Sequence, residues 1–140
     1  MNPILIIEDE VSLVKILKSV FEKSGFEVDS AYNGENGLTQ FKTKTYDCVI
    51  LDITMPRMDG WEVLSEIRKR SDVPVVMMTA LTGEDYELKG YDLKADDYVT
   101  KPFSPKILVA KVNNLVMRYE GQYKENKSQM SIGNLVYDKD

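Results

Sequence analysis

The stretch Cys48-Val49-Ile50-Leu51-Asp52 decides the fold, because a short run without any polar residue ends abruptly at a carboxylate. A strand that is apolar on both faces belongs in the middle of a parallel sheet covered by helices on both sides. Around this stretch, short apolar runs rich in β-branched residues alternate with helix-periodic segments. The sequence therefore predicts an α/β protein with a doubly wound parallel sheet.

Five strands and five helices are expected along the chain. The strands are predicted at 4–7, 27–31, 48–51, 74–78 and 97–100, and the first helix ends before Gly25, which suits a helix C′ position. Further helices are predicted after Asn33-Gly34, at 60–70 and at 84–93, and the last begins with Ser104 as N-cap and Pro105 as its first residue. This is the flavodoxin-like arrangement, with strand order 2-1-3-4-5.

Composition excludes several classes of protein. The chain has 140 residues, 43% of them apolar, and a net charge of −5, which argues against binding nucleic acid or an anionic membrane through this surface. It has no histidine and a single cysteine, Cys48, so zinc fingers and His-based triads lack their parts. No apolar run approaches the length of a signal peptide or membrane span, so we expect a soluble, cytoplasmic protein.

The C-terminal end departs from the regular pattern. A domain is predicted over residues 1–120, followed by a polar linker over 121–130 where the apolar periodicity stops. Ile132, Leu135 and Val136 then form a brief strand-like segment within 131–140. We interpret that segment as the start of a second domain that the chain does not complete.

Reactive side chains follow four of the five predicted strands. Glu8 and Asp9 come after the first, Asp52 after the third, Thr79 after the fourth and Lys101 after the last. Because ligands of doubly wound sheets bind outside the carboxyl ends of the strands, these side chains are expected to share one site. Any one of them alone is more simply explained as a solvated loop residue or a helix cap.

Several carboxylates at one site suit a hard divalent cation, and Mg²⁺ is the expected ion. Once the cation neutralises the cluster, one carboxylate can attack a phosphoryl group while a lysine and a hydroxyl stabilise the transferred oxygens. Without the cation, the repulsion between Glu8, Asp9 and Asp52 should oppose folding. The residues thus predict an aspartyl-phosphate site.

Four motifs in this order resemble the receiver domain of bacterial two-component response regulators, over roughly residues 2–120: Glu8-Asp9-Glu10, Asp52-Ile-Thr-Met-Pro56-Arg-Met-Asp-Gly60, Thr79-Ala80 and Asp96-Asp97-Tyr98-Val-Thr-Lys101-Pro102-Phe103. The resemblance implies that Asp52 accepts the phosphoryl group and Lys101 binds it. It also implies that Glu8, Asp9, Asp52 and the carbonyl of Thr54 hold Mg²⁺, and that Thr79 and Tyr98 form a switch. Pro56 and Gly60 would shape the loop beside Asp52. The Lys101–Pro102 peptide bond would be cis, a conformation that only about 5–6% of X–Pro bonds adopt in folded proteins.

The resemblance also implies partners. The phosphoryl donor would be a phosphohistidine of a sensor histidine kinase, and the chain would be no enzyme beyond catalysing its own phosphorylation and dephosphorylation. The segment 131–138 is similar to the opening strand of the winged-helix DNA-binding domain of the OmpR/PhoB group. Members of that group dimerise on activation through the fourth helix, fifth strand and fifth helix. This chain offers the charges of Asp96, Asp97 and Lys111 there, but has Ile107 and Asn114 where the group's fuller set of charges is expected.

Three alternatives remain open from the sequence. A protein-interaction module with this fold would not depend on phosphorylation. A haloacid-dehalogenase-like phosphatase also uses a strand-end aspartate, and Asp52-x-Thr54 is close to its signature, but 140 residues leave no room for its cap domain. A flavodoxin-like FMN binder shares the topology, although Glu8-Asp9-Glu10 would repel the phosphate of the cofactor.

Overall fold

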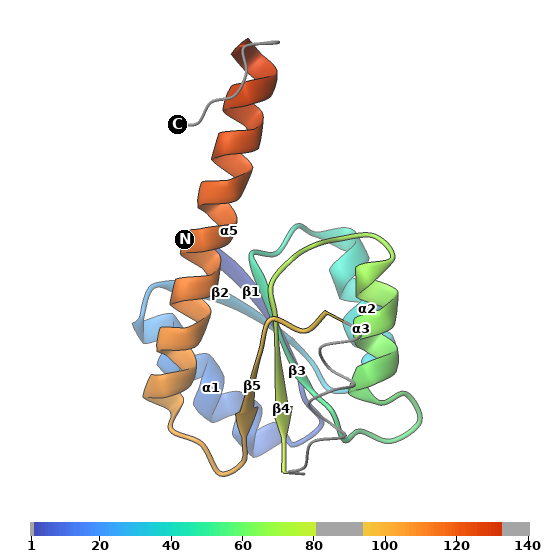
Figure 1. The fold of residues 1–140 in the computed structure, drawn as a ribbon. Coiled ribbons are helices and arrows are strands. Elements are labelled where there is room, and N and C mark those ends of the chain that lie inside the picture. Colours follow the sequence, from blue (N-terminus) through green and yellow to red (C-terminus); the bar gives the residue numbers. More distant parts are fainter. Residues whose placement is uncertain (1, 81–93, 133–140) are drawn as a thin grey trace.

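Five parallel strands cross the middle of the molecule in the order β2-β1-β3-β4-β5 (Figure 1). The structure, a computed structural model, describes residues 2–80 and 94–132. The strands are β1 (Asn2–Ile7), β2 (Phe26–Ala31), β3 (Cys48–Asp52), β4 (Val75–Thr79) and β5 (Asp97–Thr100). The predicted fold class and strand order are confirmed, and each strand lies within a residue or two of its predicted range.

Helices cover both faces of this sheet. Figure 1 shows α1 (Val11–Lys23) and α5 (Pro105–Ile132) on one side, and α2 (Gly34–Thr43) and α3 (Gly60–Arg68) on the other. The helix predicted at 84–93 falls outside the described residues. All strand pairs are parallel, as expected for a sheet built from β-α units.

The alternation of side chains along each strand divides the core into two halves. Ile4, Ile6 and Ile50 face α1 and α5, whereas Leu5 and Ile7 face the opposite layer with α2 and α3. Because both faces of β1, β3 and β4 are buried, these strands need the continuous apolar runs that identify them in the sequence. Their carboxyl ends are thereby fixed beside one another.

Local sequence signals set the helix ends. Asn33 caps α2 by accepting a hydrogen bond from the Asn36 amide, and Asp59 forms a capping box with Glu62 at the start of α3. Gly25 follows α1 with a φ of +96°, a left-handed conformation that favours glycine, as predicted. The backbone therefore turns where the sequence indicates.

The polar stretch 121–129 differs from the sequence prediction. It is helical, and α5 runs without interruption to Ile132, so that its C-terminal half projects away from the body of the domain (Figure 1). Glutamine, lysine and glutamate are good helix formers and the stretch contains no proline, so a helix can continue even without an apolar face to bury. The strand predicted within 131–140 extends into residues 133–140, outside the described residues, so the boundary at 120 stays a prediction.

We predict that Gly60→Ala lowers the free energy of unfolding by about 1–3 kcal/mol, because a Cβ at this position would overlap the backbone. It would clash with the carbonyl oxygen of Asp52 and lie 2.7 Å from Cα of Ile53. The matched control is Gly121→Ala on α5, where an added Cβ would meet no other described part of the chain within 4 Å, apart from its own helix and its chain neighbours. That variant should gain up to about 1 kcal/mol. Urea titrations of both variants check this, and equal effects would contradict it.

Candidate functional site

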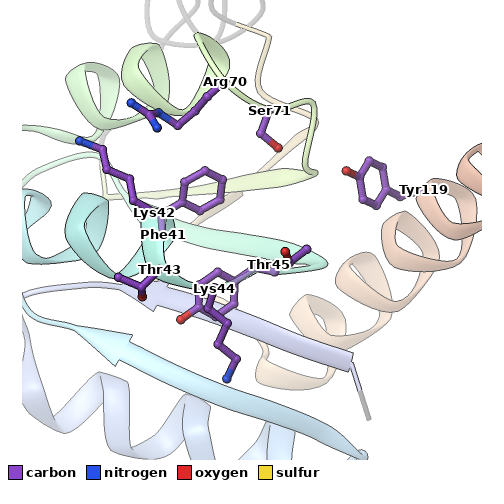
Figure 2. A pocket seen from close by; sticks show the side chains of 9 residues that line it. Phe41, Lys42, Thr43, Lys44, Thr45, Arg70, Ser71 and Tyr119 are labelled. Atoms are coloured by element: carbon purple, nitrogen blue, oxygen red, sulfur yellow. The ribbon is translucent and has the colours of Figure 1, made fainter.

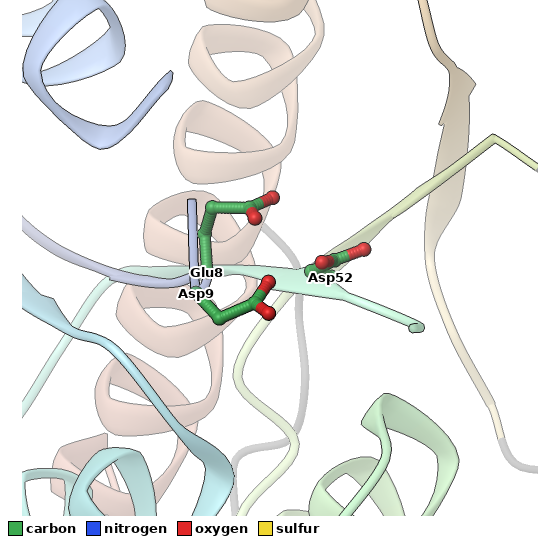
Figure 3. Close-up of side chains that lie close together, drawn as sticks. All are labelled: Glu8, Asp9 and Asp52. Atoms are coloured by element: carbon green, nitrogen blue, oxygen red, sulfur yellow. The ribbon is translucent and has the colours of Figure 1, made fainter. Parts of the chain in front are cut away.

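Three carboxylates meet at the carboxyl-terminal edge of the sheet (Figure 3). Glu8 and Asp9 directly follow β1, and Asp52 is the last residue of the neighbouring strand β3. One oxygen from each carboxylate lies within 4.8 Å of the others. The predicted acidic cluster is therefore assembled by the register of two adjacent parallel strands.

Two of these carboxylates are buried. Glu8 is 0% exposed and Asp52 is 2% exposed, whereas Asp9 faces solvent. The buried pair is held by backbone amides: Glu10 donates to Oε2 of Glu8 at 2.9 Å, and Thr54 donates to Oδ1 of Asp52 at 3.2 Å. Amide donors partly replace the water that each carboxylate loses on burial.

Lys101 brings the positive charge of the site. Its Nζ lies 3.0 Å from Oε1 of Glu8 and 3.6 Å from Oδ1 of Asp52. The Lys101–Pro102 bond is cis, as predicted, and the Lys101 amide donates to the carbonyl of Thr79 at 2.7 Å. Thr79 itself is buried at the end of β4. The structure therefore brings Lys101 and Thr79 to the same edge as the acids.

Burial dominates the electrostatics of the cluster. It raises the pKa of Glu8 to about 7, helped by the negative charge of Asp52 and opposed by the Glu10 amide and Lys101. The pKa of Asp52 is also raised by burial, with Lys101 opposing the shift. For Lys101, burial favours the neutral amine, but the two carboxylates outweigh it and raise the pKa. The site thus holds more negative charge than its own lysine compensates.

The loop after β3 brings the remaining predicted residues close to Asp52. Thr54 and Pro56 are exposed, and the backbone amide of Gly60 donates to the carbonyl of Ile53 at 2.8 Å, which folds the loop back against β3. Gly60 is buried there because no side chain fits beside Asp52. The turn assigned to this proline and glycine is therefore present.

Tyr98 lies on β5, in register with Met77 of β4, and packs half-buried against the core layer that contains α2 and α3. Its strand neighbour Asp97 forms an ion pair with Lys111 of α5 at 3.0 Å. Two charges that the sequence offered for a dimer contact therefore pair with each other within the chain. The strand that carries Tyr98 ends next to Lys101, which is the geometry that a coupled movement would need.

A second charged network was not predicted. Arg68, the last residue of α3, donates to the carbonyls of Lys94 and Val73 at 2.9 Å and 2.7 Å, and pairs with Asp96 at 2.9 Å. Asp96 in turn accepts the amide of Val75 at 2.8 Å. The network fixes the starts of β4 and β5, and thereby the positions of Thr79 and Lys101 at their far ends. An arginine at a helix end is usually solvated, so the position of Arg68 in the sequence does not predict that it bonds to these residues.

Residues 4–113 match the family described as the response regulator receiver domain. The chain belongs to this family. It is the receiver domain of a two-component response regulator, and the predicted family is confirmed. The match covers the whole region that holds the acidic cluster, Thr79 and Lys101.

Relatives of this receiver domain include transcriptional regulators. The chain is 44% identical over 117 residues to the probable transcriptional regulator ycf27 of Cyanophora paradoxa, covering 84% of this chain and 49% of that protein. It is 39% identical over 122 residues to the regulatory protein VanRB of Enterococcus faecalis, covering 87% of this chain and 56% of the relative. The chain therefore spans about half the length of these relatives.

Solved structures of response regulators have the same fold as this chain. The receiver domain of a Francisella response regulator superimposes with a TM-score of 0.81 at 32% identity, covering 84% of this chain and 98% of that domain. A two-component response regulator from Clostridium difficile gives the same TM-score and identity over the same shares of the two chains. Within residues 2–80 and 94–132, no helix is both long and apolar enough to cross a membrane.

The stability of the metal-free receiver domain should fall as the pH rises from about 4.5 to about 7, because Glu8 binds a proton more tightly in the folded state than in the unfolded state. The protonated Glu8 contributes its full stabilisation at a pH below its pKa in the unfolded chain, about 4.5, and this stabilisation is lost as the pH rises through its pKa in the folded domain, about 7. Urea titrations in EDTA across this range measure the slope.

Replacing Glu8 by Gln should flatten that slope, whereas the exposed control Glu22→Gln on α1 should leave it unchanged. A slope that Glu8→Gln does not alter would show that Glu8 is ionised normally in the folded domain.

Proposed function

We propose that Asp52 accepts a phosphoryl group from the phosphohistidine of a sensor histidine kinase, in a reaction that depends on Mg²⁺. The observation that carries the proposal is the placement of Asp52, buried at a strand end with a lysine ammonium at 3.6 Å and two further carboxylates around it. Buried carboxylates gathered in this way are stabilised by a bound cation. A cation at this place would also serve the transfer of a phosphoryl group to Asp52.

The residues present fit a hard divalent cation. Glu8, Asp9 and Asp52 offer carboxylate oxygens that lie within 4.8 Å of one another, and we assign the backbone carbonyl of Thr54 as a fourth ligand. Oxygen donors of this kind are the ligands that Mg²⁺ prefers. When bound, the cation would neutralise the carboxylates and orient the oxygens of the incoming phosphoryl group.

In the transfer step, an Oδ atom of Asp52 attacks phosphorus. The new O–P bond forms as the P–N bond to the donor histidine breaks, and the bonding electrons leave with the imidazole nitrogen. The ammonium of Lys101 and the hydroxyl of Thr79 would stabilise the negative charge on the transferred oxygens. Hydrolysis reverses the modification by attack of water on phosphorus, which returns the Asp52 carboxylate and releases phosphate.

Lys101 links this chemistry to the fold. Its Nζ lies closer to Glu8 than to Asp52, at 3.0 Å against 3.6 Å. A phosphoryl group on Asp52 would compete for that ammonium, and Thr79 would move toward the same oxygens. Tyr98 on the adjacent strand β5 would move together with Thr79. The surface formed by β5 and α5 would then differ between the phosphorylated and the unphosphorylated domain.

The output we propose is control of transcription, through a DNA-binding domain of the OmpR/PhoB kind that continues beyond the receiver domain. Two relatives that match this chain over the receiver region, ycf27 of Cyanophora paradoxa and YclJ of Bacillus subtilis, are named as transcriptional regulators. Activation would favour a homodimer through the fourth helix, β5 and α5, where Ile107 and Met117 are 56% and 62% exposed. Because a sensor kinase delivers its phosphoryl group in the cytoplasm, we place the regulator there.

Incubation with acetyl phosphate and Mg²⁺ should add one phosphoryl group, visible as a mass increase, and Asp52→Asn should abolish it. EDTA should prevent labelling of the wild type. The matched control is Asp59→Asn, a partly exposed helix cap in the following loop, which should be labelled like the wild type. Equal labelling of Asp52→Asn and the wild type would contradict the assignment and favour an interaction module that needs no phosphorylation.

A further inference from the structure

A hollow of about 400 Å³ lies at the end of the sheet where β3 and β4 begin (Figure 2). The end of α2, the loop after α3 and the middle of α5 enclose it, through Phe41 to Tyr46, Arg70, Ser71 and Tyr119. Sites for small ligands typically have volumes of roughly 300–1,000 Å³. None of these lining residues takes part in the proposed phosphorylation of Asp52.

Two cations, one from α2 and one from the loop after α3, line this hollow. Figure 2 shows the ammonium of Lys42, from the last turn of α2, and the guanidinium of Arg70, just after α3, on the same side of the hollow beside the Phe41 ring. Among the described residues, neither cation has a hydrogen bond or an ion pair. Lys44 is different, because its ammonium is bound by Glu27 and by Asp29 at 3.0 Å.

The surroundings do not neutralise this charge. The exposed carboxyl of Glu66 interacts electrostatically with Lys42 and Arg70, but its pKa is lowered chiefly by its hydrogen bond to Lys69, at 2.9 Å. Lys42, Lys69 and Arg70 therefore gather around the carboxylate of Glu66, on a chain whose net charge is −5. Like charges held together raise the free energy unless an anion binds between them.

Helix ends account for part of this pattern only. Cations in the last turn of a helix interact favourably with the helix dipole, which explains Lys42 on α2 but not Arg70, which lies beyond the last turn of α3. It does not explain why Lys42 and Arg70 line the same hollow. Nor does it explain the aromatic lining, in which Phe41 stacks on Tyr46 with ring centroids 6.3 Å apart and Tyr119 stands across the hollow (Figure 2).

We propose that this hollow binds a small phosphate monoester carried on a planar ring, of which a nucleoside monophosphate is the representative. The phosphate would lie between Lys42 and Arg70, whose charges match a dianion. The ring would lie against Phe41 and Tyr119. The hydroxyls of Thr45 and Ser71, which also line the hollow, would form hydrogen bonds with polar groups of the ligand. Because Tyr119 belongs to α5, the bound ligand would tie that helix to α2 and the loop after α3.

The test is calorimetric titration of the 140-residue chain with adenosine 5′-monophosphate in EDTA, which keeps metal-dependent phosphate binding away from Asp52. We expect a dissociation constant on the order of 1 mM or tighter, weakening as salt is added. Adenosine and ribose 5-phosphate, titrated separately, distinguish a need for the ring from a need for the phosphate, and both should bind more weakly than the whole nucleotide.

Lys42→Gln combined with Arg70→Gln should weaken binding at least about tenfold, since each removes a charge that faces the phosphate. The matched control combines Lys15→Gln with Lys23→Gln, two exposed cations on α1, and should bind like the wild type. Amide NMR shifts on binding should gather at residues 41–46, 70, 71 and 119. Asp52→Asn should bind equally well, which separates this proposal from the phosphorylation of Asp52.

Four results would overturn the proposal: no saturable binding of the nucleotide, equal loss in the α1 control, NMR shifts confined to the Asp52 edge, or binding of an acidic peptide without binding of the nucleotide. The last result would identify the hollow as a protein-docking surface. Unchanged thermal melting of the double variant shows that any loss of binding is not a loss of folding.

Discussion

The burial of two carboxylates at the ends of adjacent strands is the constraint on which the rest of the structure depends. Ile7 of β1 pairs with Leu51 of β3, so the residues that follow, Glu8 and Asp52, must emerge side by side. Both lose most of their water, and backbone amides and Lys101 replace only part of it. The apolar runs that make these strands central are therefore also the cause of the charged site.

Several features away from the cluster serve to hold it in place. Gly60 lets the loop after β3 approach the backbone of Asp52, and the Arg68–Asp96 network fixes the beginnings of β4 and β5. The ends of these strands carry Thr79 and Lys101. The two ends of the sheet thus differ: the Arg68–Asp96 network lies where β4 and β5 begin, and the acidic cluster lies where β1 and β3 end.

Much of this was predictable because it depends on patterns within short segments. Apolar runs predicted the strands, and the shared edge of their carboxyl ends predicted that Glu8, Asp52, Thr79 and Lys101 would meet. The sequence could not show that Lys101 is nearer to Glu8 than to Asp52, because that choice depends on side-chain geometry. The Arg68 network and the hollow at Lys42 and Arg70 join distant segments without a spacing pattern. The extent of α5 was missed because its C-terminal half has helix-forming residues but no regular apolar stripe.

The most direct test of the account is a comparison of unfolding free energies for the wild type and Asp52→Asn, by urea titration in EDTA and in excess Mg²⁺. If the carboxylates repel one another, the variant is more stable in EDTA, by roughly 1–2 kcal/mol. Mg²⁺ then stabilises the wild type more than the variant, because an ion that binds only the folded state adds RT ln(1 + [L]/Kd). A variant that is less stable in EDTA and gains as much from Mg²⁺ as the wild type would contradict the account, since Asp52 would then share neither charge nor cation with its neighbours.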